Sequence, residues 1–227
     1  MFSIVIPLFN EEKNITPLID EIADSISIYN NYEIILINDA STDKTLNTIK
    51  KIKNSSVKVI NNLINKGQSY SIHKGIEYSK NNIIITIDGD GQNDPNDIPK
   101  LLEIYISNSE IKLIGGIRKN RKDTIIKKIS SKIANSIRSI ILKDNCKDTG
   151  CSLKVFDKKI FLSFPYFDGI HRFLPALFKG YGYKTKFINV NHRTRKYGVS
   201  KYGTINRLII GIRDILKVNR MLKNKKL

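Results

Sequence analysis

The sequence contains no tryptophan and only two cysteines, Cys146 and Cys151, which are separated by four residues. No group of Cys and His residues surrounds them, so they cannot supply the ligands of a structural zinc site. With so few thiols we expect a reduced, cytosolic chain. No run of about eighteen apolar residues occurs, the length that a membrane-spanning helix needs. The opening stretch MFSIVIPLFNEE also lacks a basic region, so we expect no signal peptide.

Acidic residues are scarce: 21 Asp and Glu stand against 39 Lys and Arg, a formal net charge of +18. Such an excess favours an anionic partner: nucleic acid, a membrane surface or a phosphorylated substrate. The chain is also rich in Ile and Asn, as an AT-rich genome would encode, so part of the charge reflects composition. Basic residues are not interleaved with aromatic ones, and we expect no nucleic-acid partner.

Linkers rich in Pro, Gly or Ser are absent, as are internal repeats, and 41% of the 227 residues are hydrophobic. A chain of this kind can bury a substantial core. We therefore expect one catalytic or binding domain over residues 1–203 and a C-terminal basic amphipathic helix over residues 204–227.

Short, nearly continuous β-branched runs predict strands that are covered on both faces, at residues 3–8, 33–37, 57–60, 83–87 and 112–117. Helical patterns lie between them, near residues 15–29, 43–53, 68–80 and 96–107. This alternation is typical of an α/β fold with a doubly wound, mostly parallel sheet. Such sheets bind ligands beyond the carboxyl ends of their strands, so the site is expected there.

After residue 122 the pattern changes. A helix is expected near residues 126–140, a short strand at 150–156, a helix near 170–180, a strand at 184–190, a polar loop at 191–203 and a helix at about 204–222. The last helix carries an apolar stripe flanked by Lys and Arg, which is typical of a helix lying on an anionic membrane surface. Packing of this helix on its own domain is the alternative.

The first predicted strand ends in Pro7, Leu8, Phe9, Asn10 and Glu11, without the glycine-rich turn of a dinucleotide-binding unit, so we expect no NAD site. Asn10 and Glu11 offer hydrogen-bonding groups to a base or ribose. They equally suit a helix N-terminus.

Asp39 ends the second strand and could accept a hydrogen bond from a ribose hydroxyl or a base.

Asp88 and Asp90 follow a buried strand directly, in IIITIDGDGQNDP. Side chains two residues apart on an extended strand share a face, so both carboxylates can approach one hard cation. Mg²⁺ or Mn²⁺ bound by one or two carboxylates completes its shell with water and phosphate oxygens. Gln92 is a further oxygen donor. The alternative is a solvated Asp-Gly turn.

Together, IPLFNEE, EIILINDASTDKT, NKGQSYSIHKGIEYSKNN, IIITIDGDGQNDP and GGIRKNRKD resemble the family 2 glycosyltransferases, which have a GT-A-like nucleotide-sugar-binding fold and a metal-binding DxD sequence. CKDTGCSLKVF, FDGIHRFLPALFKGYGYKT and HRTRKYGVSKYG resemble the polyprenyl-phosphate branch, which is similar to dolichol-phosphate mannose synthase. The likeness spans roughly residues 2–215.

The resemblance implies a role for each matching residue. The nucleoside would be held by Pro7, Phe9, Asn10, Glu11 and Asp39, and the metal on the diphosphate by Asp88, Asp90 and Gln92. Arg118 would face the phosphates at the reaction centre. Lys127 and Ser131 would lie near the acceptor phosphate, and the donor diphosphate would be covered by Arg195, Ser200 and Lys201.

The implied reaction is the inverting, metal-dependent transfer of a hexose, mannose or glucose, from a nucleotide-diphosphate sugar to a polyprenyl phosphate at the cytosolic membrane face. An integral-membrane partner would flip or use the product. A hydroxyl acceptor is the alternative, and it would need a general base, for which Asp148 is the nominee. A nucleotidyltransferase is disfavoured because no Gly-rich, basic loop follows the first strand.

Several positions depart from the family pattern. Asn38 stands where an aspartate is common, Ala40 and Lys44 replace glycines, and Lys127 replaces an arginine. These changes bear on base selectivity and acceptor fit. The three histidines, His73, His171 and His192, are expected to be structural.

Overall fold

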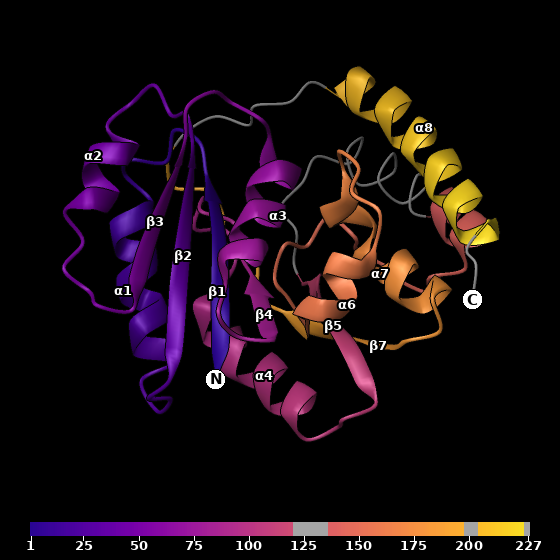
Figure 1. Cartoon of the computed structure of the whole chain (residues 1–227), viewed down its shortest axis with the longest axis horizontal. Helices are drawn as coiled ribbons and strands as arrows, with labels where there is room; N and C mark the ends of the chain where they lie inside the picture. Colours follow the sequence, from indigo (N-terminus) through magenta and orange to yellow (C-terminus); the bar gives the residue numbers. More distant parts are fainter. Residues whose placement is uncertain (120–135, 198–203, 225–227) are drawn as a thin grey trace.

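The structure, a computed structural model, describes residues 1–119, 136–197 and 204–224, with the backbone alone for residues 204–210. Within these ranges the chain forms a single seven-stranded mixed sheet flanked by helices (Figure 1). The strands are β1 (Phe2–Leu8), β2 (Tyr32–Asp39), β3 (Val57–Asn62), β4 (Ile83–Thr86), β5 (Ile111–Arg118), β6 (Lys154–Asp157) and β7 (Lys184–Val190).

The strand order is β3-β2-β1-β4-β6-β5-β7. The first four strands in this order are mutually parallel, and β5 is parallel to β7. The short strand β6 runs antiparallel to both of its neighbours, β4 and β5. The prediction of a mostly parallel α/β sheet is confirmed.

The helices are α1 (Ile15–Ser25), α2 (Thr45–Lys50), α3 (Gln68–Tyr78), the 3-10 turn η1 (Pro95–Asp97), α4 (Ile98–Ile106), α6 (Lys158–Ser163), α7 (Ile170–Gly180) and α8 (Thr204–Lys223). Residues 136–142 are also helical and overlap the helix expected near 126–140, the rest of which lies outside the described residues. Helix α6 was not predicted from the sequence, because its six residues are too short for a clear apolar period.

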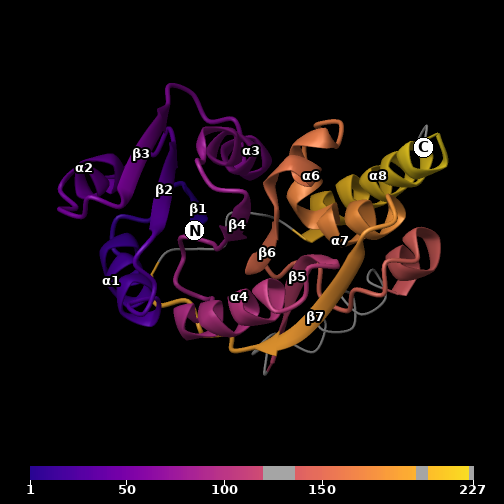
Figure 2. The same ribbon diagram turned by 60° about the horizontal axis from the view of Figure 1, so that its bottom comes forward.

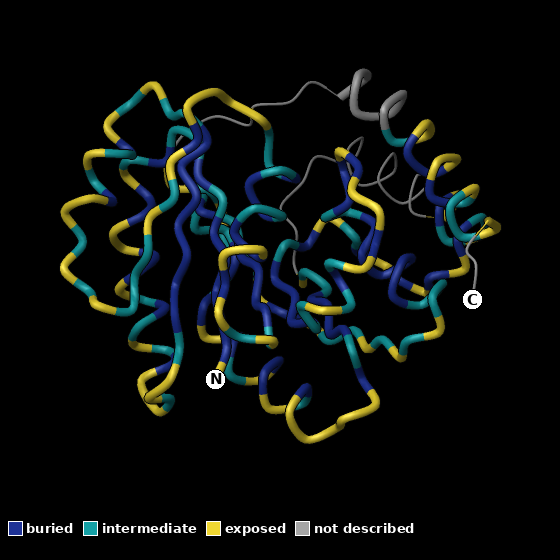
Figure 3. The backbone as a smooth tube through the Cα atoms, viewed as in Figure 1, coloured by how far each residue is buried: buried dark blue, intermediate teal, exposed yellow. Residues whose placement is uncertain are grey.

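Helices cover both faces of the sheet, as a doubly wound fold requires (Figure 2). One hydrophobic cluster joins α1 and α4 to one face of the sheet through residues such as Ile4 and Ile6 of β1. The other cluster joins α3, α6 and α7 to the opposite face, which Val5 of β1 reaches. Successive residues of a strand point to opposite faces, so the unbroken apolar run of β1 serves both clusters. Figure 3 shows the central strands buried along most of their length.

Helix α8 packs against α7. Val218 and Ile215 enter the second cluster, and Arg172 of α7 pairs with Asp214 at 2.7 Å. A Cβ atom at Gly180 would lie 2.4 Å from Leu222, so the absence of a side chain there permits the close approach. No helix within the described residues combines the length and apolar character needed to cross a bilayer.

The parallel strands β1, β2 and β3 all end at the upper edge of the molecule in Figure 1. This carboxyl edge carries the loops that contain the predicted site residues.

Candidate functional site

Asp88 and Asp90 follow β4 at the carboxyl edge, as predicted. The chain continues the sheet for one residue beyond β4, since Ile87 donates its N–H to the Val5 carbonyl at 3.3 Å. Gly89 then lies on the end of β1, where an added Cβ would be 2.3 Å from Leu8 and 3.3 Å from the Pro7 carbonyl oxygen. Glycine is therefore required between the two acids for this close packing.

The two carboxylates are half-buried and lie in different settings. The Asp88 Oδ1 atom accepts a hydrogen bond of 2.7 Å from Gln68 at the first turn of α3. The Asp90 Oδ1 atom accepts from the Gln92 backbone N–H at 3.1 Å, and Asp90 Oδ2 lies 3.6 Å from the Arg195 guanidinium.

Burial and the neighbouring Asp90 carboxylate raise the pKa of Asp88 to about 6, against the opposing effects of Ser152, Lys154 and Arg118. The ionised pair is thus electrostatically unfavourable without a further cation. Among the described residues, no group of three or more Cys, His, Asp and Glu side chains could enclose a metal on its own. A pair of carboxylates suits Mg²⁺ or Mn²⁺, which proteins usually bind through one or two carboxylates, with water and phosphate oxygens as the remaining ligands.

Gln92 tethers the segment after β7 to this loop. Its backbone carbonyl accepts from the Arg193 N–H at 2.8 Å, and its side-chain amide donates to the Arg193 carbonyl at 3.3 Å. Residues Asn93 and His192 form an antiparallel bridge beside it. The predicted role of Gln92 as an oxygen ligand stays a prediction, and its observed contacts join two loops.

Arg195 lies between two acids of the site. Its Nη2 atom is 2.6 Å from Glu11 Oε1 and 3.6 Å from Asp90 Oδ2. The loop that carries it is held further by Arg193, which pairs with Glu21 and with Asp94. The polar loop after β7 is therefore docked on the carboxyl edge through arginines, whose charge partly neutralises the acids there.

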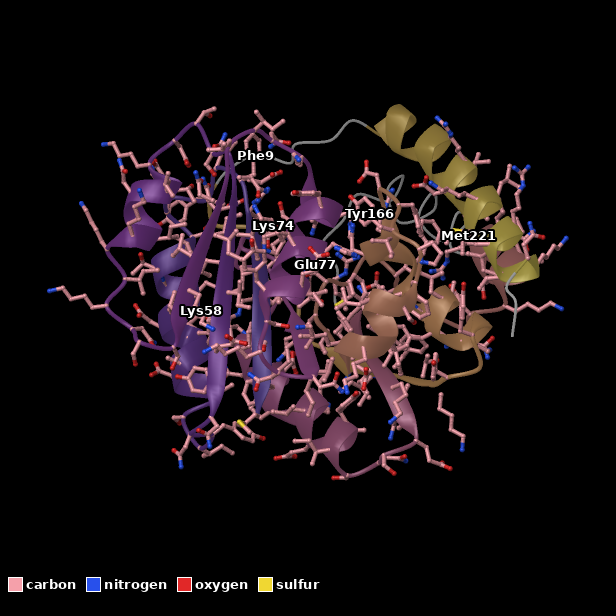
Figure 4. All side chains as sticks on the ribbon, in the orientation of Figure 1. Phe9, Lys58, Lys74, Glu77, Tyr166 and Met221 are labelled. Atoms are coloured by element: carbon pink, nitrogen blue, oxygen red, sulfur yellow. The ribbon has the colours of Figure 1, made fainter. Side chains whose placement is uncertain are left out.

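The residues after β1 bind the loop after β2. Asn10 adopts a left-handed backbone conformation with φ of 57°, and its side chain exchanges hydrogen bonds with Thr42. The Glu11 N–H donates to Thr45 at 2.8 Å. The N-cap of α1 is Asn14, so Asn10 and Glu11 do not cap this helix. Pro7 and Phe9 lie half-buried beside them, with Phe9 labelled at the carboxyl edge in Figure 4.

Asp39 is buried at the end of β2, and its carboxylate already has protein partners. It accepts from the Lys66 and Gly67 N–H groups at 2.9 and 2.7 Å and from Asn62 at 2.9 Å. The proposed contact of Asp39 with a nucleoside stays a prediction, and the observed role of its carboxylate is to hold the loop between β3 and α3.

Arg118 ends β5, and Asp148 binds it through both carboxylate oxygens. Arg118 Nε donates to Oδ2 at 2.8 Å, Nη2 donates to Oδ1 at 2.7 Å, and the Arg118 backbone N–H donates to Oδ2 at 3.1 Å. A Cβ atom at Gly150 would lie 2.8 Å from Arg118 Nη2, so this glycine leaves the space that the guanidinium occupies. Asp148 in this way holds Arg118 close enough to Asp88 for their charges to interact.

Two residues near the site were missed by sequence reasoning. Gln68, the hydrogen-bond donor to Asp88, lies in the quoted stretch NKGQSYS, but nothing in its type or position marks it. Lys154 on β6 is buried, and its ammonium donates to the Cys151 carbonyl and to the Thr149 carbonyl. A lysine inside the apolar strand SLKVF was a usable signal, because a buried charge needs fixed partners.

Two of the three histidines, His171 and His73, make contacts inside the protein, and the expectation that the histidines are structural stays a prediction. His171 is paired with Ser69 through Nδ1 at 2.7 Å, and burial lowers its pKa to about 3. His73 packs on Phe161 and Tyr166.

Four of the predicted residues, Lys127, Ser131, Ser200 and Lys201, lie outside the described residues. The remaining predicted residues all lie at the carboxyl edge or beside it.

The model of Glycosyl transferase family 2 matches residues 3–164. The chain belongs to glycosyl transferase family 2. This glycosyltransferase is 36% identical to a dodecaprenyl-phosphate galacturonate synthase from Rhizobium johnstonii, over 98% of the chain and 68% of the relative. It is 30% identical to an undecaprenyl-phosphate 4-deoxy-4-formamido-L-arabinose transferase from Aeromonas hydrophila, over 91% of the chain and 64% of the relative.

These relatives confirm the resemblance to the polyprenyl-phosphate branch. The glycosyltransferase spans about two thirds of their length, 68% of the first and 64% of the second. Its fold is similar to that of glucosyl-3-phosphoglycerate synthase from Mycobacterium tuberculosis, crystallised with Mn²⁺ and UDP: the TM-score is 0.73 at 16% identity, over 98% of this chain and 79% of that one. Mannosyl-3-phosphoglycerate synthase from Rubrobacter xylanophilus gives a TM-score of 0.73 at 13% identity, over 100% of this chain and 75% of that one. The expected GT-A-like fold is confirmed.

Proposed function

We propose that this glycosyltransferase moves a sugar, with inversion, from a nucleotide-diphosphate donor to a polyprenyl phosphate. Its curated relatives act on dodecaprenyl and undecaprenyl phosphates, which supports the acceptor class. The predicted mannose or glucose remains part of the proposal, and galacturonate and the formamido-arabinose of the relatives are further donors to compare.

The observation that carries the acceptor assignment is the pairing of Asp148 with Arg118. An alcohol acceptor must lose a proton as it attacks, so it needs a base within hydrogen-bond reach. Asp148 is the nominee for that base, yet both of its oxygens accept from Arg118. A phosphate monoester, with a second pKa of about 6, is already ionised near neutral pH and needs no base. Asp148 therefore supports a phosphate acceptor by holding Arg118.

The chemistry follows from the residues at the carboxyl edge. An acceptor phosphate oxygen attacks the anomeric carbon, the bond from that carbon to the donor diphosphate breaks, and the electron pair leaves on the diphosphate. Asp88 and Asp90, with Gln92, would hold Mg²⁺ or Mn²⁺, which as a Lewis acid lowers the cost of that leaving charge. Arg118 adds positive potential that is already in place before the reaction.

The donor nucleoside would lie against Pro7, Phe9, Asn10, Glu11 and Asp39. Arg195 would turn from Glu11 and Asp90 toward the donor diphosphate, together with Ser200 and Lys201, and Lys127 and Ser131 would bind the acceptor phosphate. The two positive φ residues at this edge, Asn10 and Ala40, fit a site whose backbone is held in a strained shape.

Helix α8 supports the proposed attachment at the inner membrane face. Its inner side is buried on α7, whereas Ile212 and Leu216, one turn apart, are 52% and 59% exposed. Arg213 and Lys217 lie exposed beside them. An apolar pair between cations suits the surface of an anionic bilayer. In this proposal residues 204–227 form a membrane-surface helix packed on the catalytic domain of residues 1–203, and an integral-membrane partner takes up the product.

Transfer of labelled sugar to polyprenyl phosphate tests the function. With Mn²⁺ and a panel of UDP- and GDP-sugars, we expect turnover with at least one donor, and a loss of about a hundredfold or more for Asp90→Asn. Asp24→Asn, at an exposed position near the end of α1, is the matched control and should keep wild-type turnover. Equal activity of Asp90→Asn and wild type, or transfer to alcohols but not to phosphates, would contradict the proposal.

A further inference from the structure

The loop between β3 and α3 displays two neighbouring apolar side chains to solvent. Leu63 is 92% exposed and Ile64 is 64% exposed. We refer to these two residues as the 63–64 tip. Single exposed apolar residues are ordinary on protein surfaces, but an adjacent Leu-Ile pair at the end of a loop beside the site has a cost in solvation.

The 63–64 tip is presented by a braced backbone. Before it, the Asn62 side chain donates to Asp39 Oδ1 at 2.9 Å. After it, the Lys66 and Gly67 N–H groups donate to the Asp39 carboxylate, and the Asn65 side chain donates to the Asp39 carbonyl at 3.1 Å. Because buried Asp39 holds both flanks, the tip cannot fold back onto the protein without breaking these hydrogen bonds.

The tip lies at the carboxyl edge, beside the site. In Figures 1 and 3 the loop forms an exposed arch at the top of the molecule, where β3 ends and α3 begins. The first turn of α3 supplies Gln68, which contacts Asp88. A surface that binds the 63–64 tip would therefore also face the carboxyl edge that carries Asp88.

The lysines next to the tip outnumber the carboxylate that it contacts. Residues 61–74 contain Lys66 and Lys74 and no acidic residue, and the carboxylate bound to this stretch is that of the buried Asp39. Lys74 donates to the Asn62 side chain at 2.8 Å, which places its ammonium next to the base of the tip. Apolar side chains flanked by cations are complementary to an anionic bilayer, where the cations meet headgroups and the apolar atoms enter the acyl boundary.

We propose that the 63–64 tip inserts into the surface of an anionic lipid bilayer and so sets the carboxyl edge against the membrane. The inference rests on the proposed function, in which the acceptor is a lipid phosphate. A protruding pair of residues is a poor match for a protein partner, since a stable protein interface buries roughly 800 Å² on each side. A fluid bilayer accepts such a protrusion without a complementary surface.

A single tryptophan tests insertion directly, because the chain has none of its own. Leu63→Trp in the full chain is mixed with vesicles of phosphatidylcholine and phosphatidylglycerol, with and without brominated lipid. We expect a blue-shifted emission that brominated lipid quenches. Ile28→Trp is the matched control: Ile28 is 73% exposed in the loop between α1 and β2, at the opposite edge of the sheet, and the emission of this variant should be the same with and without vesicles.

A double substitution separates membrane insertion from catalysis. Leu63→Ser/Ile64→Ser should bind the same vesicles about tenfold or more less tightly than wild type, since each lost contact removes buried apolar area. Turnover with a short, water-soluble prenyl phosphate should remain within about twofold of wild type. If wild type transfers no sugar to either acceptor, the proposed function is wrong. The fluorescence experiment still tests insertion of the 63–64 tip, because it does not depend on sugar transfer.

Several results would overturn the tip proposal. One is that vesicles leave the emission of the Leu63→Trp protein unchanged. The others are that wild type does not sediment with vesicles, or that the double-serine variant binds vesicles as tightly as wild type does. A fall in the mass of the lipid-free protein on the double-serine substitution would assign the tip to a contact with a second copy instead.

Discussion

The Arg118 guanidinium and the Asp148 carboxylate form a two-pronged ion pair, with contacts of 2.8 and 2.7 Å, and the Arg118 backbone N–H adds a third hydrogen bond to the same carboxylate. Both side chains are largely buried, at 16% and 8% exposure. Truncation of either partner leaves the other charge buried and uncompensated. The geometry assigns Asp148 to positioning Arg118.

Asp148→Asn is predicted to lower kcat with a polyprenyl phosphate by about tenfold to a hundredfold, since an amide holds the guanidinium less firmly. The acidic limb of the pH–rate profile should stay in place, because no proton passes to Asp148. Steady-state rates between about pH 5 and 9 check this. In a double-mutant cycle, Arg118→Ala/Asp148→Ala should be no slower than Arg118→Ala alone. Loss of the acidic limb in Asp148→Asn would identify Asp148 as a base.

The second prediction concerns the stability of the metal-free protein. Because the pKa of Asp88 is raised from 3.8 to about 6, the folded chain holds a proton between these values that the unfolded chain has released. The Asp88 contribution to the free energy of unfolding is therefore full below pH 3.8 and is lost as pH rises through about 6. Asp88→Asn should raise the melting temperature near neutral pH in EDTA.

His171 changes the stability with pH in the opposite direction. Wild type must therefore be compared with Asp88→Asn at each pH. The His171 pKa of about 3 in the folded chain means that its stabilising contribution is lost as pH falls from 6.5 toward 3. The difference in melting temperature between wild type and Asp88→Asn at each pH cancels the His171 contribution, because both proteins contain it. Mn²⁺ should raise the melting temperature of wild type and not that of Asp88→Asn. A pH-independent difference between the two proteins would contradict the raised pKa.

Arg195 supplies the third prediction. Its guanidinium lies 3.6 Å from Asp90 Oδ2, so it competes electrostatically with a metal at that carboxylate. Without nucleotide, Arg195→Gln should bind Mn²⁺ about threefold to tenfold more tightly, as measured by electron paramagnetic resonance of the free ion. With Mn²⁺ present, the same variant should bind nucleotide diphosphate more weakly.

Arg193→Gln is the control for Arg195, because Arg193 pairs with Glu21 and Asp94 on the same loop and has no contact of this kind with Asp90 among the described residues. Its Mn²⁺ affinity should change much less than that of Arg195→Gln, since Arg193 acts on the metal site only by holding the loop. A weaker Mn²⁺ affinity in Arg195→Gln would show that Arg195 organises the metal site and does not oppose the cation.

The fourth prediction follows from a departure from the family pattern. Ala40, where the resemblance to the family implies a glycine, adopts a left-handed backbone with φ of 53°. A side chain costs about 1–2 kcal/mol in that conformation, and glycine has an entropic cost of about 0.5–1 kcal/mol. Ala40→Gly should therefore stabilise the protein by about 0.5–1 kcal/mol and raise the melting temperature by about 1–4 °C. Calorimetry measures this change.

Gly91→Ala is the opposite substitution at a matched conformation. Gly91 has a φ of 71°, and an added Cβ atom would have no other atom within 4 Å, so strain is the main effect of an added methyl group. Gly91→Ala should therefore lower the melting temperature by about as much as Ala40→Gly raises it. A destabilised Ala40→Gly protein would mean that the alanine methyl group makes packing contacts worth more than the strain.

The order of residues along the chain is enough to predict a mostly parallel sheet, the edge at which such a sheet binds ligands, and the family, but not the strand order or the antiparallel strand β6. Unbroken β-branched runs predict strands covered on both faces, and parallel strands must bring their carboxyl ends to one edge. This rule places Asp39, Asp88 and Asp90 together without knowledge of the coordinates. The order and spacing of the motifs then indicate a glycosyltransferase, because such an ordered set is hard to obtain by chance.

The pairing of the side chains, by contrast, depends on the folded chain. Asp148 is thirty residues from Arg118 along the chain, and Arg195 is far from both Glu11 and Asp90, so no local period relates them. Likewise, only the fold shows that Asp39 braces the 63–64 tip and that one side of α8 is buried. Hydrophobic periodicity specifies which face of an element is covered, whereas the partner of a charged or hydrogen-bonding group depends on contacts between distant segments.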